Sequence, residues 1–407
     1  MSEHELVNRF GSLPRAEPRV VVSGNFATPT RLMGLFDSAV EGYRLFALNA
    51  QLSLPDRKGV VYETPFVGPG MRGHPSLDYL PMRLSLVPRL FAVARPPDIV
   101  LLHTSPPRAG KVSLGIEVNI LPAAIDHARA NGGLIVAQCN PNMPYTYGDA
   151  EIDTDAIDLA FEGEEELAVP ARRQGGDTAM AIAEGVASLV GDGSTLQVGI
   201  GEVPDAVVGL LQSRRGLRIW TEAMSDGVLA LDRCGALAPD VPITATFLFG
   251  SEELYKWVDG NMAVQMLRTE TVNDPTAIAA HDAMCSLNAA VQVDLWAQAN
   301  ASYVRGRIHS GFGGQPDFVV GALHSRGGQA IIALPSWHEK SGSSTIVGLL
   351  DAPATSFQHS AVVTEQGCAR IFGRSQRAQA RLLIEETAHP AARAALWELA
   401  GTMGSST

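Results

Sequence analysis

The chain has 407 residues, more than a single hydrophobic core ordinarily serves, so two domains are expected. Hydrophobic residues make up 46% of it, and its 40 glycines and 25 prolines indicate a turn-rich globular α/β protein rather than a disordered or coiled-coil one. The formal net charge of −12 argues against a nucleic-acid partner, because no basic face balances it. An anionic cofactor is still compatible, since it needs only a few local cations or backbone N–H groups.

The composition also bears on where the protein works. Its four cysteines, Cys139, Cys234, Cys285 and Cys368, form no CxxC pair and fit free thiols in a reducing compartment. The first ten residues are polar and acidic, unlike a secretory signal. No apolar run approaches the ~20 residues that a membrane helix requires. We therefore expect a cytoplasmic protein without a membrane partner.

The first part of the chain alternates strand-like and helix-like segments. Short apolar runs predict strands at 19–24, 98–105 and 132–140. The apolar spacing of 117–131 predicts a helix between the last two, and strand, helix and strand in series imply a parallel sheet. Segment 169–177 is polar and contains proline and glycine, which is typical of a linker. We therefore place an N-terminal α/β domain at residues 1–175.

After this linker the alternation resumes. A helix is predicted at 178–190 and a late one at 375–388. Strands are predicted at 194–201, 243–250, 289–298, 329–335 and 360–367. The fold class expected is α/β, with two related domains built on mainly parallel sheets, the second at residues 176–407. A cleft between two such domains is the usual place for an active site.

Several familiar site motifs fail on inspection. Segment 199–204, GIGEVP, begins like a dinucleotide-binding fingerprint, but Pro204 stands where the third glycine belongs. Segment 311–316, GFGGQP, fails in the same way at Pro316. HEKSG at 338–342 is not an HExxH motif, and the histidines lack ligand spacing, so no metal site is expected.

A single carboxylate, Glu222, follows the predicted strand 217–220 and precedes Asp226-Gly227, a turn signal. These residues alone allow two interpretations. Thr221 can cap a helix whose positive end favours a glutamate. Alternatively, Glu222 is a nucleophile, because active sites in open α/β sheets collect at the carboxyl ends of strands.

Two glycine-rich turns follow predicted strands. Around Gly199 and Gly201 the chain passes from a strand into a helix, so backbone N–H groups are free to meet an anion or a carbonyl oxygen. In SGFGGQPDF, residues 310–318, the missing side chain of Gly311 lets a substrate approach the backbone. Turn formation alone also explains both. Together with Glu222 they supply a nucleophile and candidate oxyanion donors.

A series of short segments covers nearly the whole chain in one order. They are SPPRAGKVSLG (105–115), NPNMPYTYGDAEI (140–152), LQVGIGEVPDAV (196–207), TEAMSDGV (221–228), FLFGSEELY (247–255), VNDP (272–275), SLNAAVQVDLWAQ (286–298), SGFGGQPDF (310–318), VVTEQGCARIFG (362–373) and AHP (388–390). In this order they resemble the acetyl-CoA hydrolase/transferase family, especially its 4-hydroxybutyrate CoA-transferase branch. The resemblance implies two related α/β domains and a homodimer. It also implies acyl-CoA and small carboxylates as substrates, with no tightly bound cofactor.

The resemblance assigns roles to individual residues. Glu222 matches the nucleophile of the family's strand-end block. Asn273 and a backbone N–H at Gly313 or Gly314 match its oxyanion donors, although a turn before Pro275 also explains the asparagine.

Further site residues follow with alternatives left open. Gly199 and Gly201 are expected to border the acyl pocket. Glu365 matches a recurrent position near the active centre and either orients the nucleophile or the thioester chain, or serves as a structural strand-end carboxylate. Lys340, in a Gly/Ser loop, is a candidate contact for the phosphates of CoA.

The implied reaction moves CoA between short-chain carboxylic acids. Glu222 attacks a thioester to give an acyl-glutamyl anhydride, and the CoA thiolate then returns to form a glutamyl-CoA thioester. An acyl-CoA hydrolase would use the same residues, with water intercepting an intermediate. A third hypothesis is a non-catalytic acyl-CoA-binding paralogue. Departures from the usual family pattern at Arg108, Glu202 and Trp337 leave the acyl group open, because bulky or charged replacements change which acids a pocket accepts.

Overall fold

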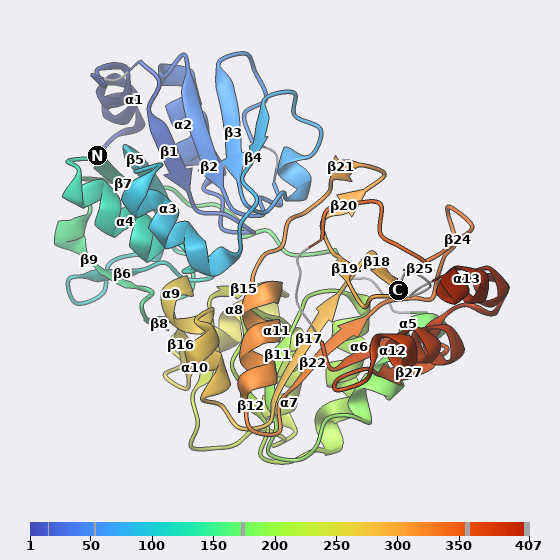
Figure 1. Ribbon diagram of the computed structural model, residues 1–407. Coiled ribbons are helices and arrows are strands. Elements are labelled where there is room, and N and C mark those ends of the chain that lie inside the picture. Colours follow the sequence, from blue (N-terminus) through green and yellow to red (C-terminus); the bar gives the residue numbers. More distant parts are fainter. Residues whose placement is uncertain (15, 53, 172–175, 355–358, 403–407) are drawn as a thin grey trace.

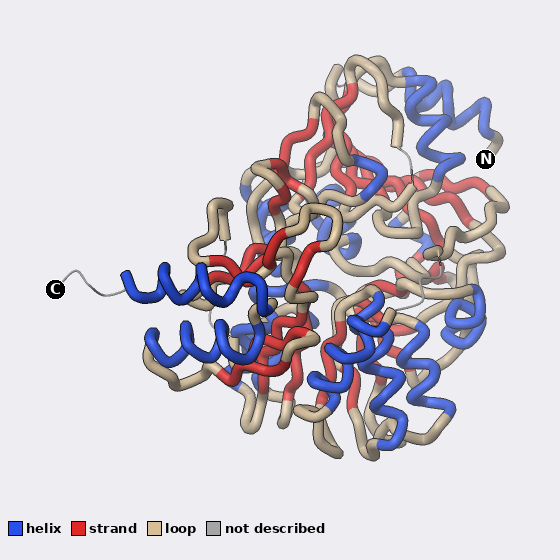
Figure 2. Tube along the Cα trace, turned by 90° about the vertical axis from the view of Figure 1, so that its right-hand side faces the viewer, coloured by secondary structure: helices blue, strands red, loops and turns tan. Residues whose placement is uncertain are grey.

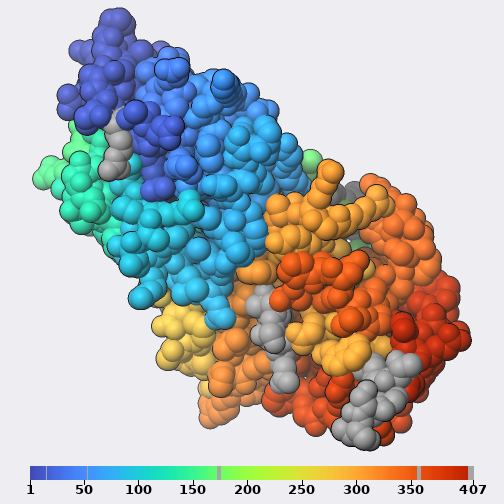
Figure 3. Space-filling view, turned by 45° about the horizontal axis from the view of Figure 1, so that its top comes forward, coloured from blue at the N-terminus to red at the C-terminus, as the bar shows by residue number. Residues whose placement is uncertain are grey.

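Two β-sheets organise the chain, one in each half, and give it two lobes (Figure 1). A computed structural model describes residues 1–402 except positions 15, 53, 172–175 and 355–358. Part of the linker expected at 169–177 therefore lies outside the described residues, and the boundary drawn there stays a prediction. In a space-filling view the N-terminal and C-terminal lobes touch along a broad border (Figure 3).

The N-terminal sheet has seven strands, all parallel, in the order β10-β7-β5-β1-β2-β3-β4. Their bounds are β1 Arg19–Val22, β2 Tyr43–Ala47, β3 Val60–Thr64, β4 Leu77–Tyr79, β5 Ile99–Thr104, β7 Leu134–Cys139 and β10 Leu159–Glu162. The strands predicted at 19–24, 98–105 and 132–140 are thus confirmed. Continuous apolar runs mark them because helices cover both faces of the sheet.

Alternate side chains of each strand serve opposite faces of this sheet. Val20 and Val22 pack with α1 (Glu3–Gly11) and α2 (Thr30–Ala39), whereas Val21 packs in a separate cluster with α3 (Val87–Val93) and α4 (Leu121–Ala130). The helix predicted at 117–131 begins only at Leu121, where Pro122 occupies a first-turn position that needs no N–H donor. Residues 117–120 precede the helix.

The C-terminal sheet has six strands in the order β12-β11-β17-β22-β26-β27, parallel except for the last pair. Their bounds are β11 Thr195–Val198, β12 Arg218–Ile219, β17 Met284–Ala289, β22 Gln329–Ala333, β26 Ala361–Thr364 and β27 Gly367–Arg370. Helices α5 (Asp177–Ala187) and α6 (Glu202–Leu210) cover one face, and α11 (Gln315–His324) covers the other. The predicted helix at 178–190 and strands at 194–201, 329–335 and 360–367 are confirmed.

Helices at the end of the chain pack outside this sheet. The helix predicted at 375–388 forms as α12 (Gln376–Leu382) and continues as a π-helical turn, η5 (Leu383–Thr387). It is followed by α13 (Pro390–Thr402), which lies beside α12 at the far end of the C-terminal lobe (Figure 2).

Three expectations for the second half were wrong. Segment 243–250 divides into β14 (Ile243–Ala245) and β15 (Phe247–Leu248), which join different small sheets. Segment 289–298 contributes only the short β18 (Gln292–Asp294), while the long strand of that region is β17, whose alternation of small and polar side chains hides it.

The third wrong expectation concerns Asp226-Gly227, which opens a helix rather than a turn. Helix α7 spans Asp226–Arg233 with Ser225 before it, so the acidic residue favours the positive end of a helix. Thr221 caps no helix, because its hydroxyl donates to the carbonyl oxygens of Ala223 and Val198.

The remaining elements are short. The helical ones are η1 Pro69–Met71, η2 Leu84–Leu86, η3 Thr154–Ala156, η4 Leu211–Ser213, α8 Glu252–Val258, α9 Thr269–Val272 and α10 Pro275–Ala279. The strands are β6 Lys111–Ser113, β8 Tyr147–Gly148, β9 Glu151–Asp153, β13 Ala223–Met224, β16 Val264–Met266, β19 Ala299–Asn300, β20 Tyr303–Val304, β21 Arg307–Ile308, β23 Trp337–His338, β24 Ser343–Ser344 and β25 Ile346–Val347. Within the described residues no helix is both long and apolar enough to cross a membrane.

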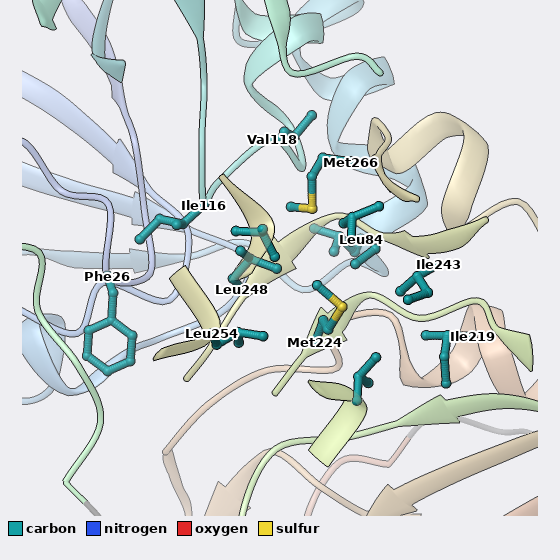
Figure 4. Packing of buried hydrophobic residues seen from close by; sticks show 14 of the residues in the cluster. Phe26, Leu84, Ile116, Val118, Ile219, Met224, Ile243, Leu248, Leu254 and Met266 are labelled. Carbon is teal, nitrogen blue, oxygen red and sulfur yellow. The ribbon is translucent and has the colours of Figure 1, made fainter. Parts of the chain in front are cut away.

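One hydrophobic cluster runs through both lobes. Phe26, Leu84 and Ile116 from the N-terminal lobe pack in the same cluster as Met224 and Leu248 from the C-terminal lobe (Figure 4). Burial of apolar surface on this scale stabilises the arrangement of the two sheets as well as each sheet.

In each sheet the strand order reverses at one position, called a switch point, and both switch points face the border between the lobes. In the N-terminal sheet the strand order reverses between β1 and β5, and Asn25 follows the carboxyl end of β1. In the C-terminal sheet it reverses between β11 and β17, which end beside Gly199 and Asn288. Ligands of open α/β sheets bind at such points. Asn25, Gly199 and Asn288 line one cavity.

Candidate active site

A cavity of about 250 Å³ lies between the lobes, at the two switch points. The N-terminal lobe lines it with Asn25, Leu48, Asn49, Phe66 and Leu84. The C-terminal lobe adds Gln197, Val198, Gly199, Ile200, Glu222, Ala223, Phe247, Asn288, Ala289, Ala301, Ser310, Gly311, Phe312, Gly313, Gly314, Gln315 and Phe318. Among these described lining residues, Glu222 alone carries an ionisable side chain. A lone carboxylate in a largely apolar cavity marks a candidate for chemistry.

The backbone of Glu222 is fixed on both sides. The N–H groups of Thr246 and Phe247 donate to its carbonyl oxygen at 3.0 and 3.1 Å, and the Thr246 hydroxyl donates to the same oxygen at 2.9 Å. Thr221 donates its own N–H to the Thr244 carbonyl at 3.0 Å. These bonds fix the backbone from which the Glu222 side chain reaches the cavity.

Asn273 donates from Nδ2 to Oε2 of Glu222 at 2.9 Å. It is fully buried and follows α9, with its N–H donating to the Thr269 carbonyl. The indole of Trp220 donates to the Val272 carbonyl at 3.0 Å, so the residues that precede Glu222 and Asn273 are also bonded to each other. The Asn273 amide is therefore bonded directly to the Glu222 carboxylate, and the residue also ends a helix; its predicted role as an oxyanion donor stays a prediction.

The glycine turn before α11 completes the surroundings of the carboxylate. The backbone N–H of Gly314 donates to Glu222. A methyl group on Gly314 would lie closer than van der Waals contact to Glu222 Oε2 and Asn273 Nδ2. Gly313 has φ 57°, which favours glycine, and a methyl group there would lie 3.1 Å from the Phe66 ring. The absence of side chains at these two glycines thus leaves open space beside the Glu222 carboxylate.

The cavity changes the acid–base behaviour of Glu222. Burial raises the pKa of its carboxyl to about 7, and the negative charge of Asp317 adds to the rise. Hydrogen bonds from Asn273 and Gly314 act in the opposite direction, because they stabilise the ionised form. Such a group is partly ionised at neutral pH and is less strongly solvated than a surface carboxylate.

The N-terminal lobe holds the glycine turn in place. The N–H of Leu84 donates to the Gly313 carbonyl at 2.9 Å. The neighbouring Ser85 donates to the buried carboxylate of Asp317, from its hydroxyl at 2.8 Å and from its N–H at 3.2 Å. Arg83 approaches the same carboxylate at 3.5 Å. Segment 83–85 therefore acts as a latch that positions the turn next to Glu222.

We expect Ser85→Ala to lower the turnover number several-fold and the stability by about 1–3 kcal/mol, because the fully buried Asp317 carboxylate loses a hydroxyl donor. Steady-state kinetics and thermal unfolding measure the two effects. Ser188→Ala is the matched control, since the exposed Ser188 hydroxyl bonds only to the Gly185 carbonyl one turn earlier in its own helix. Equal behaviour of the two variants would show that the latch does not position the turn.

The structure brings some of the other predicted site residues to the cavity and leaves others outside it. Gly199 and Gly311 line the cavity, whereas Gly201 lies beyond it at the start of α6. Glu365 does not line it either; it accepts hydrogen bonds from the N–H and hydroxyl of Ser336. Lys340 is exposed in the turn between β23 and β24. The roles of Glu365 and Lys340 toward a bound thioester stay predictions.

Other residues of the site were not singled out from the sequence. Asn25 and Asn49 line the cavity from the N-terminal lobe, and Asp317 lies next to Glu222. The position of Asn25 just after a predicted strand could have identified it, whereas the place of Asp317 depends on tertiary contacts. Where the structure describes side chains, it contains no group of three or more His, Cys, Asp or Glu suited to a metal ion.

Comparison with known proteins identifies the family. A family model described as the acetyl-CoA hydrolase/transferase C-terminal domain matches residues 250–400. The chain is 39% identical over 331 residues to a 4-hydroxybutyrate coenzyme A transferase of Clostridium kluyveri, an alignment that covers 78% of this chain and 76% of that protein. The chain belongs to the acetyl-CoA hydrolase/transferase family. The resemblance seen in the sequence is thereby confirmed.

Solved structures agree with this family assignment. RipA from Yersinia pestis matches with a TM-score of 0.90 and 27% identity over 99% of each chain. A 4-hydroxybutyrate CoA-transferase from Porphyromonas gingivalis matches with a TM-score of 0.82 and 30% identity, covering 98% of this chain and 96% of that one. The predicted fold class, α/β with mainly parallel sheets, is confirmed for this acetyl-CoA hydrolase/transferase family member, and its assignment to the CoA-transferases is confirmed at the level of the family.

Proposed function

We propose that this protein moves CoA between short-chain carboxylic acids, with Glu222 as the covalent nucleophile. The observation that carries the proposal is the placement of the Glu222 carboxylate in the cavity between the lobes, next to two N–H donors, the Asn273 amide and the Gly314 backbone. A carboxylate suits CoA transfer because both covalent states formed on it are activated acyl groups, so the energy of the thioester is kept.

In the first half-reaction a Glu222 oxygen attacks the thioester carbonyl, and the C–S bond breaks to give an acyl-glutamyl anhydride and CoA thiolate. The thiolate then attacks the glutamyl carbonyl, which releases the donor acid and leaves Glu222 as its CoA thioester. A second carboxylate reverses these steps and leaves as its own CoA ester. Each attack develops an oxyanion, and the Asn273 and Gly314 donors are the nearest groups to receive it.

The dimensions and lining of the cavity favour small acyl groups. A volume of about 250 Å³ holds an acyl chain of a few carbons but not a whole CoA, whose nucleotide must extend outside. Phe66, Phe247 and Phe312 contribute aromatic walls. Walls of this kind limit water around an anhydride, which favours transfer over hydrolysis.

One experiment separates transfer from hydrolysis and from binding alone. The protein is incubated with a panel of short-chain acyl-CoA donors, with and without a second carboxylate, and thioesters are separated by chromatography. We expect a new acyl-CoA whose rate of formation depends on the acceptor concentration. CoA release that ignores the acceptor would indicate a hydrolase, and no turnover of any donor would indicate a binding protein. The homodimer, the cytoplasmic location and the lack of a tightly bound cofactor stay predictions.

The reaction should slow in mild acid. Below about pH 7 the Glu222 carboxyl becomes protonated and loses its nucleophilic electron pair, so kcat/KM for the acyl-CoA donor should fall about tenfold for each further pH unit. A short-chain acceptor acid, with an ordinary pKa of about 4 to 5, stays ionised between pH 5.5 and 8 and does not contribute. Initial rates across this range test the prediction. A profile that stays flat down to pH 5.5 would contradict it.

A further inference from the structure

A second carboxyl group lies behind the wall of the cavity. Glu117 is 1% exposed and stands between Ile116 and Val118, both of which point into the hydrophobic cluster that joins the lobes (Figure 4). Glu117 follows a turn, in which its N–H donates to the Leu114 carbonyl at 3.3 Å, and it pairs with Phe247, a cavity-lining residue, in an isolated β-bridge. A carboxyl group in such surroundings needs a specific reason, because burial of a charge is costly.

The side chain of Glu117 ends a directional chain of hydrogen bonds. Gln51 donates to Asn49 Oδ1 at 3.0 Å, Asn49 donates to Asn25 Oδ1 at 2.8 Å, and Asn25 donates to Glu117 Oε2 at 2.6 Å. Asn49 and Asn25 each accept at the side-chain oxygen and donate from the side-chain nitrogen, so the orientation of Asn25 depends on an acceptor at Glu117. The other oxygen, Oε1, is buried with no hydrogen-bond partner among the described residues.

The two residues that contact Glu117 also lie close to Glu222. Phe247, the bridge partner of Glu117, donates its N–H to the Glu222 carbonyl, and Asn25 lines the cavity that contains the Glu222 side chain. Burial raises the pKa of Glu117 to about 8; the bond from Asn25 opposes the rise, and the charge of Glu222 adds to it. A buried oxygen without a partner costs less free energy in a protonated carboxyl than in a carboxylate, because the penalty is larger for a charged group.

Few charged groups act on Glu117 and Glu222. Glu222 is the charged group whose field acts on Glu117 among the described residues. Glu222 itself faces the Asn273 amide, the Gly314 N–H and the carboxylate of Asp317. Asp317 is in turn bonded by Ser85 and approached by Arg83 at 3.5 Å. No cation therefore compensates a second negative charge at Glu117 within this described set.

We propose that Glu117 is a positioning residue of the transfer site: as an uncharged acceptor it fixes the Asn25 amide at the cavity wall and keeps a second negative charge away from Glu222 while carboxylates bind. The inference rests on the proposed function, because every turnover requires an anionic acceptor to approach an anionic nucleophile or its acyl derivative. Ionisation of Glu117 would repel that acceptor while leaving the neutral thioester of the donor largely unaffected.

Two variants separate positioning from charge. Glu117→Leu removes the acceptor of Asn25, and we expect kcat/KM for the carboxylate acceptor to fall at least tenfold at pH 7. Glu117→Gln supplies an uncharged acceptor of the same shape and should rescue most of this loss. In the wild-type protein KM for the acceptor should rise above about pH 8 while KM for acyl-CoA changes little, and in Glu117→Gln that rise should disappear. An unchanged alkaline rise in Glu117→Gln would overturn the proposal.

Thermal unfolding tests the same idea without any turnover. The unfolded chain releases the Glu117 proton near pH 4.5, whereas the folded protein keeps it to about pH 8, so Glu117 makes the protein less stable as pH rises through this window. The Tm of Glu117→Gln minus the Tm of the wild type should therefore increase from pH 5 to pH 8. A constant difference would show a merely structural residue and overturn the inference. A widening difference in a protein that transfers no CoA would instead refute the proposed function.

Discussion

Glu222→Ala is expected to abolish CoA transfer while leaving the protein folded. In the proposed mechanism the variant lacks the atom on which both covalent intermediates form, and loss of a nucleophile typically costs about 10⁴-fold or more in kcat. The backbone of residue 222 keeps its bonds from Thr246 and Phe247, so the fold does not depend on the carboxylate. Removal of a partly desolvated carboxyl should even raise stability above pH 7, because burial holds its pKa well above the ordinary value.

The decisive measurement is mapping of the covalent state. Wild-type protein incubated with acyl-CoA and then with hydroxylamine or borohydride should carry a modification on the peptide that contains Glu222, and the variant should carry none. Glu252→Gln is a suitable control, because that carboxylate is exposed on α8 and pairs only with Lys256, one turn further along. Transfer by Glu222→Ala at the wild-type rate would end the assignment of the nucleophile.

Gly314→Ala is expected to lower the rate of CoA transfer nearly as much as Glu222→Ala, because it adds a methyl group beside the carboxylate. The backbone of Gly314 has φ −88° and ψ 0°, in the bridge region, which is sparsely populated but open to alanine, so the change does not by itself forbid the turn. The new Cβ would overlap Oε2 of Glu222 and Nδ2 of Asn273 and force them apart. Displacement of a nucleophile by about 1 Å costs ~10²-fold, and loss of an oxyanion donor costs ~10²–10³-fold. We expect a fall in kcat of about 10³-fold.

Steady-state kinetics on the folded variant tests this expectation, with Gly209→Ala as the matched control. Gly209 lies in α6, and a methyl group there would meet no atom within 4 Å. That control should keep full activity and gain stability by about 0.5–1 kcal/mol, the usual benefit of alanine over glycine in a helix. A Gly314→Ala variant with wild-type kcat would show that the carboxylate does not react in the position seen here.

The sequence predicted the sheets, and the presence of Glu222 in the cavity, better than the walls of the site. The strands around 19–24, 98–105 and 329–335 are continuous apolar runs, and such runs identify parallel strands covered on both faces. Strand β17, MCSLNA, was not predicted, because small and polar side chains like these are also typical of loops. It nevertheless forms the centre of the C-terminal sheet.

Glu222, Asn273 and Gly314 were predicted from their place in family segments, and the structure joins them by hydrogen bonds. Glu117 was not identified as a site residue from the sequence, because it was expected to begin a helix that in fact starts at Leu121. Its contact with Asn25 spans 92 positions of the chain, and no local pattern encodes such a distance. Asp317 was visible in a family segment, but its function depends on Ser85, which lies 232 positions away.

The shared hydrophobic cluster constrains how the protein can move. Phe26, Leu84 and Ile116 on one side and Met224 and Leu248 on the other belong to one apolar core, so a hinge that swung the lobes apart would expose that core to water. Any opening that preserves this core must therefore take place in the segments that rim the cavity. A substrate enters an interior whose walls are already assembled, and little conformational entropy has to be lost before the reaction begins.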